Sequence, residues 1–189
     1  MNSRKISIFS GILSLVLVIL ACTFNIGGPS YPTPPILVST EAVGELKSSL
    51  ETAVAAGAQS GQITLTLTES QLTSYLSYKL LGQPHPLFYN PQVYLRAGQL
   101  KIYGTVKKGY FQATARIIFN AAIDNQGKLS IELYSADFGP LPIPNGFKEI
   151  VTATIQEAYS GALGPIATGF RLQSIMIEDG TMQIIGLIK

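Results

Sequence analysis

The chain has 189 residues, of which 13% are charged, and a formal net charge of +2 at pH 7. Arg4 and Lys5 belong to an N-terminal segment that we expect to be removed, and without them the basic and acidic residues balance. A neutral chain with no basic cluster is poorly suited to binding nucleic acid, because neutralisation of the phosphates by basic side chains supplies most of the binding affinity. With one cysteine, Cys22, and one histidine, His85, the chain has neither an internal disulfide nor a histidine-rich metal site.

The first 21 residues have the pattern of an export signal. Arg4 and Lys5 precede the apolar run Ile6–Leu20, which is short for a membrane-spanning helix. The run ends in Ile-Leu-Ala-Cys, which resembles the lipobox of bacterial lipoproteins. It predicts a signal peptide over 1–21, removed ahead of Cys22, and attachment of lipid to the Cys22 thiol. A plain secretory signal and an uncleaved anchor helix are the alternatives.

Residues 22–38 are rich in proline and glycine, which predicts an extended tether. The remaining chain, 39–189, is long enough for one domain with a sizeable core. Ser39 or Thr40 is a suitable cap for a first helix, which continues to Gly57 with apolar residues at helical spacing.

Gln62–Thr68 alternates between apolar and polar residues and is predicted to be a strand. Thr68 and Gln71 have the spacing of a capping box, so a helix should follow directly, with Leu76 and Leu80 on its apolar face, up to Gly82. The apolar, proline-rich loop 83–91 is predicted either to pack down as a lid or to stay exposed for a partner.

Two segments of similar sequence are predicted to be β-hairpins. Val93–Lys107 and Ile175–Lys189 align without a gap, and Gly104 then matches Gly186. Both alternate with the period of a half-buried strand and have turn residues at the tip. A glycine within a strand marks a bulge, a bend or the close approach of another element. Chance similarity between two hairpins of equal length is the alternative to a true repeat.

A long strand at 110–123 and a returning strand at 128–136 extend the predicted antiparallel sheet, which has one solvated face. Small residues such as Ala113 and Ala115 lie on the dry face. Pro144 is suited to the first turn of a helix, and Asn145–Leu163 has an apolar stripe at helical spacing. We therefore predict an α+β fold in which a curved antiparallel sheet wraps this long helix, with one or two shorter helices nearer the N-terminus.

The order of these elements resembles the bacterial TULIP-like proteins, in particular the LmeA-like phospholipid-binding family and the YpmS-like proteins. The resemblance covers Ile63–Ile188, through the strand that runs into Thr-Glu-x-Gln-Leu, the two glycine hairpins and the Pro-Leu-Pro-Ile-Pro loop. It implies an apolar groove or tunnel between sheet and helix that takes up acyl chains. The lipobox departs from the family pattern, in which a simple export signal or a membrane-spanning anchor is expected. The resemblance therefore does not indicate which membrane the protein serves.

A groove of this kind would bind phospholipid or another acyl lipid without catalysis. Its expected lining comes from three segments of the chain: Leu76, Leu80, Phe111, Ala113, Ala115, Ile117, Phe119, Phe147, Ile150, Val151 and Ile155. The alternative is that these residues form a filled core.

The sequence favours a lipid-anchored protein on the extracytoplasmic face of the cell membrane that binds or shuttles lipid. The alternative is an envelope scaffold that docks a protein partner through the 83–91 loop or an unpaired terminal strand. The sequence lacks a Gly-x-Ser-x-Gly elbow and the glycine-rich phosphate motifs. We therefore expect no enzyme activity, no catalytic residue, no metal and no cofactor.

Overall fold

The computed structural model describes residues 24–84, 86, 88–143, 147 and 169–189. Strands make up 47% of it and helices 26%. The elements in chain order are β1 (Phe24–Asn25), α2 (Thr40–Ser60), β2 (Gln62–Thr68), α3 (Glu69–Leu81), β3 (Tyr89–Arg96), β4 (Gln99–Lys108), β5 (Phe111–Ile123), β6 (Leu129–Asp137), β7 (Phe170–Glu178) and β8 (Thr181–Ile188).

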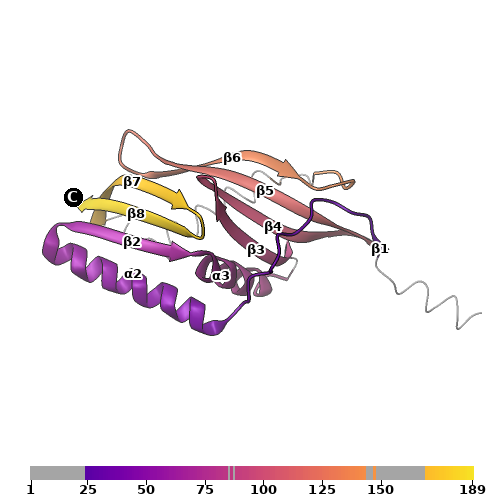
Figure 1. Ribbon diagram of the computed structural model, residues 1–189, viewed down its shortest axis with the longest axis horizontal. Helices are drawn as coiled ribbons and strands as arrows, with labels where there is room; N and C mark the ends of the chain where they lie inside the picture. The colour runs from indigo at the N-terminus through magenta and orange to yellow at the C-terminus, as the bar shows by residue number, and fades with distance from the viewer. Residues whose placement is uncertain (1–23, 85, 87, 144–146, 148–168) are drawn as a thin grey trace, which may run out of the picture.

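The strands form two sheets (Figure 1). The larger sheet has the order β1-β5-β4-β3, and β6 pairs with the part of β5 that β1 leaves free. The smaller sheet has the order β2-β8-β7. All pairs are antiparallel except β1 with β5. The first helix, α2, runs along β2, while α3 lies beside β3.

Both predicted hairpins are confirmed, as β3–β4 and β7–β8. They belong to different sheets, and their tips meet. The amide of Gly180, in the second tip, donates to the carbonyl of Leu95 near the first, at 3.0 Å. The turn of the second hairpin therefore lies against β3 of the first hairpin, close to its turn.

The glycine within each second strand marks a close approach, one of the three alternatives that a glycine in a strand predicts. A Cβ at Gly104 would overlap the ring of Phe88, which lies against the strand. At Gly186 a Cβ would lie 3.0 Å from the carbonyl oxygen of Arg171 and 3.2 Å from Leu172 Cδ2. A side chain at either position would displace its neighbour.

The predicted fold class is wrong. The described residues form two sheets, and the two helices α2 and α3 lie in the chain between β1 and the strands β3–β6 of the larger sheet. No long C-terminal helix wrapped by a sheet is present among them. The segment predicted as that helix, Asn145–Leu163, lies outside the described residues except for Phe147. The physical reason for the difference is that the apolar side chains of the hairpins are divided between two cores rather than gathered on one concave surface. Leu95 of the first hairpin lies in the first core with Ile184 of the second hairpin, whereas Val106 lies in the second core.

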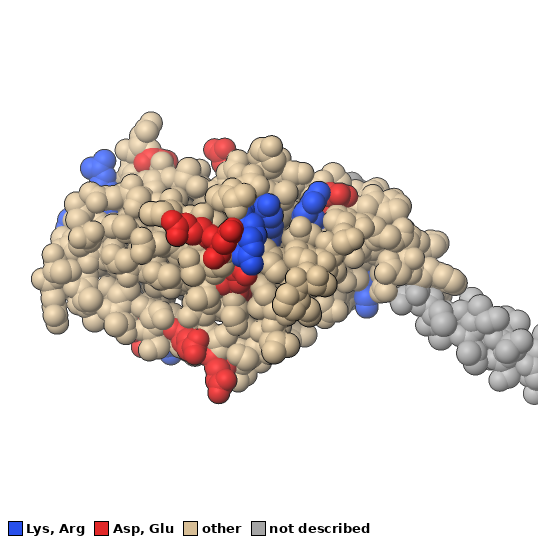
Figure 2. Space-filling model, viewed as in Figure 1, with Lys and Arg blue, Asp and Glu red and all other residues tan. Residues whose placement is uncertain are grey.

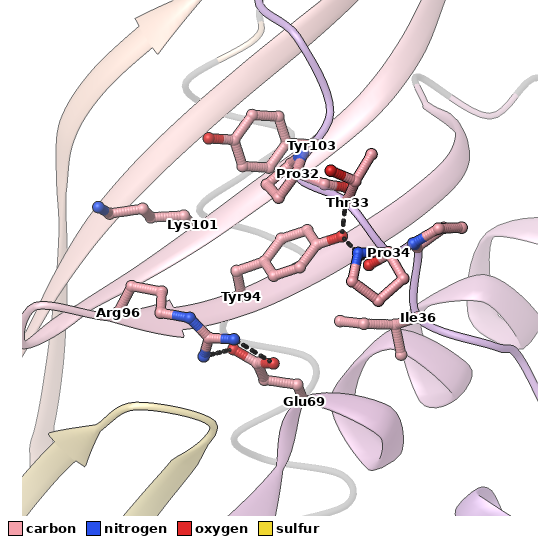
Figure 3. A pocket seen from close by; sticks show the side chains of 10 residues that line it. Pro32, Thr33, Pro34, Ile36, Glu69, Tyr94, Arg96, Lys101 and Tyr103 are labelled. Carbon is pink, nitrogen blue, oxygen red and sulfur yellow. Dashed lines mark hydrogen bonds and ion pairs between the residues drawn. The ribbon is translucent and has the colours of Figure 1, made fainter.

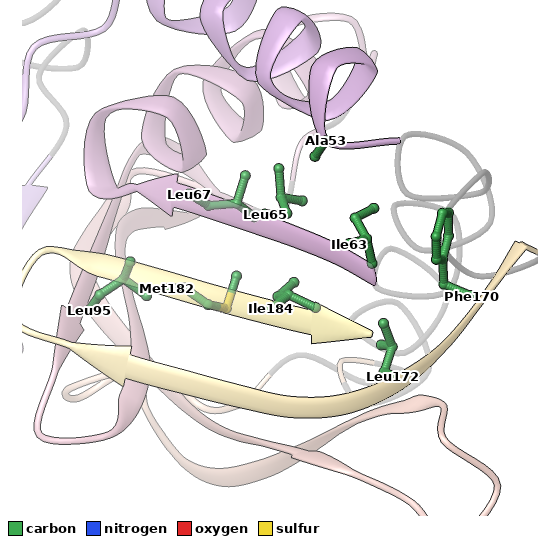
Figure 4. Close-up of a cluster of buried hydrophobic side chains, with 9 residues drawn as sticks. All are labelled: Ala53, Ile63, Leu65, Leu67, Leu95, Phe170, Leu172, Met182 and Ile184. Carbon is green, nitrogen blue, oxygen red and sulfur yellow. The ribbon is translucent and has the colours of Figure 1, made fainter. Parts of the chain in front are cut away.

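The first core lies between α2 and the smaller sheet (Figure 4). Its buried members come from α2, β2, β3, β7 and β8: Ala53, Ile63, Leu65, Leu67, Leu95, Phe170, Leu172, Met182 and Ile184. Leu95 reaches it from the larger sheet and is fully buried. The second core lies on one face of β4 and β5 and contains Leu80, Phe88, Val106, Ala113, Ala115, Ile117, Phe119, Phe138 and Phe147.

The helix α3 begins at the predicted capping box. Thr68 Oγ1 accepts from the Gln71 amide at 3.2 Å, and Gln71 Oε1 accepts from the Thr68 amide at 3.1 Å. Its buried residues are mostly polar, however: Gln71, Thr73, Ser74, Ser77 and Leu80. Each of the polar ones has a hydrogen-bond partner: Thr73 Oγ1 accepts from the Val93 amide at the edge of the sheet, Ser74 Oγ accepts from the Ser39 amide, and Ser77 Oγ donates to the Thr73 carbonyl.

The segment expected to be a tether lies on the domain in its described part, Phe24–Val38. The amides of Phe24 and Ile26 donate to the carbonyls of Tyr110 and Gln112, at 2.8 and 2.9 Å. The chain then crosses the larger sheet on the face away from the second core, and we call Tyr31–Ile36 the strap. Phe24, the second residue after Cys22, is therefore already hydrogen-bonded to the domain.

We expect Gly104→Ala to destabilise the protein by about 1–3 kcal/mol, because the new methyl group would push Phe88 out of a packed core. The matched control is Gly44→Ala, in an exposed turn of α2 with no atom near the added methyl group. It should stabilise by about 0.5–1 kcal/mol, because alanine favours the helix. Urea denaturation of both variants measures this, and equal effects would contradict the packing described for Gly104.

Candidate functional site

One edge of the larger sheet is closed by side chains of α3. The amide of Leu95 donates to Glu69 Oε1 at 2.7 Å, and the amide of Val93 donates to Thr73 Oγ1 at 2.9 Å. Four residues of helix rise about 6 Å, and two residues of strand about 6.6 Å. This match lets successive helical turns bond alternate amides of β3, so the edge is not left open to another chain.

Glu69 is the centre of a larger junction (Figure 3). Its carboxylate binds the Arg96 guanidinium through both oxygens, with Nη2 3.1 Å from Oε2. Its own amide donates to the carbonyl of Gly180 at 3.2 Å. A single residue therefore holds α3, the β3–β4 hairpin and the tip of the β7–β8 hairpin together.

The strap is held to the larger sheet by side chains of β3. Gln92 accepts from the Ile36 amide at 2.6 Å and donates to the Ile36 carbonyl at 3.0 Å. The Tyr94 hydroxyl donates to the carbonyl of Pro32 at 3.2 Å. The ring of Tyr31 lies 6.0 Å from that of Tyr103. The proline-rich chain thus lies on an aromatic surface.

A cavity of about 400 Å³ lies between the strap, the junction and the strands β3 and β4 (Figure 3). Its lining is Pro32, Thr33, Pro34, Pro35, Ile36, Glu69, Tyr94, Arg96, Lys101 and Tyr103. Basic and acidic side chains meet near the middle of the face seen in Figure 2. Among the described residues Lys101 has no ion-pair partner, so the cavity offers one ammonium group for a small polar or anionic group.

Two phenols of this region are held neutral. Burial raises the pKa of Tyr94 above its ordinary value of 10.0, and the nearby Glu69 carboxylate adds to the rise. Burial also raises the pKa of Tyr31, with a partial offset from its hydrogen bond to Thr105. At neutral pH the hydroxyl of Tyr94 is therefore a donor for the strap.

The residues predicted to line an acyl groove are brought together in part. Five of them, together with Phe147, belong to the second core: Leu80, Ala113, Ala115, Ile117 and Phe119. Leu76 packs against that core and is partly buried. Phe111 is 51% exposed, at the start of β5 and outside the core. Cys22, Ile150, Val151 and Ile155 lie outside the described residues.

The second core has a floor of small residues and a covering layer of aromatic rings. Gly104, Ala113 and Ala115 form the floor. The rings of Phe88 and Phe138 lie 6.2 Å apart, and that of Phe138 lies 4.9 Å from Phe147, edge to face. Phe88 and Phe138 lie outside helices and strands. The cavity under the strap is on the opposite face of β4, because Lys101 and Tyr103 alternate with Ile102 and Gly104.

The structure also bears on the predicted docking elements. The terminal strand β8 lies between β2 and β7, so the expectation that it is unpaired was wrong. In the 83–91 loop, Phe88 is 6% exposed and packs down on the core. Among the described residues, no helix is long and apolar enough to cross a membrane, and no cluster of three metal-ligating side chains occurs.

No protein-family model matches the chain, and no curated protein matches it either. The resemblance to TULIP-like proteins therefore receives no support from these comparisons.

Sequence reasoning did not single out the junction or the cavity. The sequence pattern assigned no role to Glu69, Thr73 or Arg96. The available signal was the spacing of Glu69 and Thr73, which lie four residues apart on a helix that directly follows a strand. Two acceptors at this spacing match alternate amides of a neighbouring strand.

We expect Glu69→Ala to destabilise the protein by about 1–3 kcal/mol, because it leaves the buried amide of Leu95 without an acceptor. Glu69→Gln keeps an acceptor oxygen and should cost less. Arg96→Ala should cost least, since the Arg96 side chain is 42% exposed. Urea denaturation ranks the three variants. A larger loss for Arg96→Ala than for Glu69→Ala would mean that the ion pair, and not the amide bond, holds the junction.

The strap should loosen at alkaline pH. A phenol whose pKa is raised in the folded state contributes its full stability below its unfolded pKa of 10.0, and loses it as pH rises through the folded value. Tyr94→Phe should flatten the fall of stability above pH 10, whereas Tyr110→Phe, at a 62% exposed position, should leave it as in the wild type. Denaturant midpoints measured across this range test the assignment, and identical profiles for all three proteins would contradict it.

Proposed function

We propose that the protein is a membrane-tethered lipoprotein, anchored through acylated Cys22 on the extracytoplasmic face, that binds lipid acyl chains against the apolar face of β4 and β5. The anchor is supported by the basic, apolar and Ile-Leu-Ala-Cys pattern of residues 1–22. The ligand is a phospholipid or another acyl lipid.

The observation that carries the acyl-binding proposal is the small-residue floor of the second core under loop-borne aromatic rings. Ala113 and Ala115 are 1% and 0% exposed, so the floor is apolar and dry. Phe88 and Phe138 cover it from segments outside helices and strands. Loop segments of this kind open at a smaller free-energy cost than core strands. Outward rotation of the rings would leave an apolar channel along β5.

The affinity of such a channel follows from the hydrophobic effect. Each buried methylene group contributes about 0.8 kcal/mol. About ten methylenes therefore supply gross stabilisation comparable to a micromolar dissociation constant, before the cost of ordering the chain. No catalytic group is required, and the lipid would be held and released unchanged.

We expect the purified full-length protein to carry non-covalent acyl lipid, and Ala115→Phe to lower the bound amount about tenfold or more by filling the channel. Native mass spectrometry before and after organic extraction separates this lipid from the anchor. The matched control is Ala122→Phe, at an exposed position on the other face of β5, which should leave the bound amount unchanged.

A second measurement does not depend on a variant that must fold. A photoreactive fatty acid added to the wild-type protein should label the peptides that contain Phe88, Ala113–Phe119 and Phe138. A wild-type protein without extractable lipid and without label on these peptides would refute the acyl-binding proposal.

A further inference from the structure

Four exposed aromatic side chains gather at one end of the larger sheet. Tyr110 is 62% exposed, Phe24 53%, Phe111 51% and Tyr89 37%. They are neighbours because Phe24 pairs with Phe111, and the Phe24 amide donates to the Tyr110 carbonyl. Tyr89 pairs with Thr105, near the end of the adjoining strand β4. In Figure 1 this end carries β1 and lies far from the C-terminus.

The same end is basic. Lys107 and Lys108 are exposed, and the ammonium of Lys107 lies 4.4 Å from the centroid of the Tyr89 ring. The strands β1, β3, β4 and β5 and the turn between β4 and β5, which carry these side chains, contain no aspartate or glutamate. Exposed aromatic rings beside lysines are the composition of a surface that lies at the headgroup level of a membrane.

The covalent chain limits how far this end can be from the anchor. Two residues of extended chain span at most about 7 Å, so the Cα atom of Phe24 is within that distance of the Cα atom of Cys22. Phe24 is already part of the sheet. A lipid on Cys22 would therefore bring the β1 end of the domain to the bilayer surface, with no spacer between them.

We propose that this end docks on the surface of an anionic lipid bilayer and orients the domain with the β1 end of the larger sheet toward it. The docking end is formed by Phe24, Tyr89, Lys107, Lys108, Tyr110 and Phe111. This inference rests on the proposed membrane attachment through Cys22. The aromatic rings lie among the headgroups, and the lysines pair with anionic lipid. Ala113 follows two residues after Phe111 on the same strand, so the apolar floor begins about 7 Å from the docked end.

The absence of tryptophan from the chain allows single tryptophans to act as depth reporters. The full-length protein would be reconstituted on vesicles of phosphatidylethanolamine and phosphatidylglycerol with brominated acyl chains. Phe111→Trp reports on the docking end. The matched control is Tyr134→Trp, at a 65% exposed position on β6 beside Ile118 and Phe119, about 23 Å along β5 from Phe111.

We expect vesicles to shift the emission of Phe111→Trp to shorter wavelength and bromine to quench it at least twofold, with neither effect at Tyr134→Trp. Flotation of the vesicles, with Cys22→Ser as the non-acylated comparison, reports attachment separately. A protein that floats without quenching at position 111, or with equal quenching at 111 and 134, overturns the docking alone. A wild-type protein that does not float overturns the anchor and the docking with it.

Discussion

The structure depends on the junction at Glu69. One carboxylate accepts the amide of Leu95 and the guanidinium of Arg96, while the backbone of the same residue bonds the tip of the β7–β8 hairpin. The junction lies where the two sheets meet, beside Leu95, which reaches from the larger sheet into the first core. The capping box at Thr68 sets where α3 begins and therefore where this carboxylate lies. A local sequence signal thus determines a long-range contact.

The two faces of the larger sheet have different chemistry. One face carries tyrosines, a lysine and an arginine beneath the strap, and the other carries alanines and isoleucines beneath aromatic rings. The strap begins at the aromatic, lysine-bearing end and crosses the polar face. Under the proposed membrane attachment, the chain would therefore rise from the bilayer over the polar face and leave the apolar face for an acyl chain. The cavity under the strap would not take part in acyl binding.

The wrong prediction of the fold class has a definite cause. The alternation in Val93–Lys107 and Ile175–Lys189 predicts hairpins with one dry face each, and both hairpins form. Alternation cannot tell whether two dry faces share one core. Here Leu95 of the first hairpin and Ile184 of the second lie in the first core, whereas Val106 of the first hairpin lies in the second core. The prediction placed a helix against the sheet face that carries Ala113 and Ala115, but the rings of the loop residues Phe88 and Phe138 occupy part of that space.

The sequence by itself determined the local elements. It placed α2 and α3 with their N-terminal caps, every strand from β2 to β8 and the two hairpins, because capping and periodicity act over a few residues. Only the tertiary structure decided the division into two sheets, the central position of β8, the packing of the strap and the role of Glu69. Each of these depends on contacts between residues far apart in the chain, such as Tyr94 with Pro32 or Glu69 with Gly180. Such contacts follow from which surfaces meet, and the local pattern of apolar residues does not specify that choice.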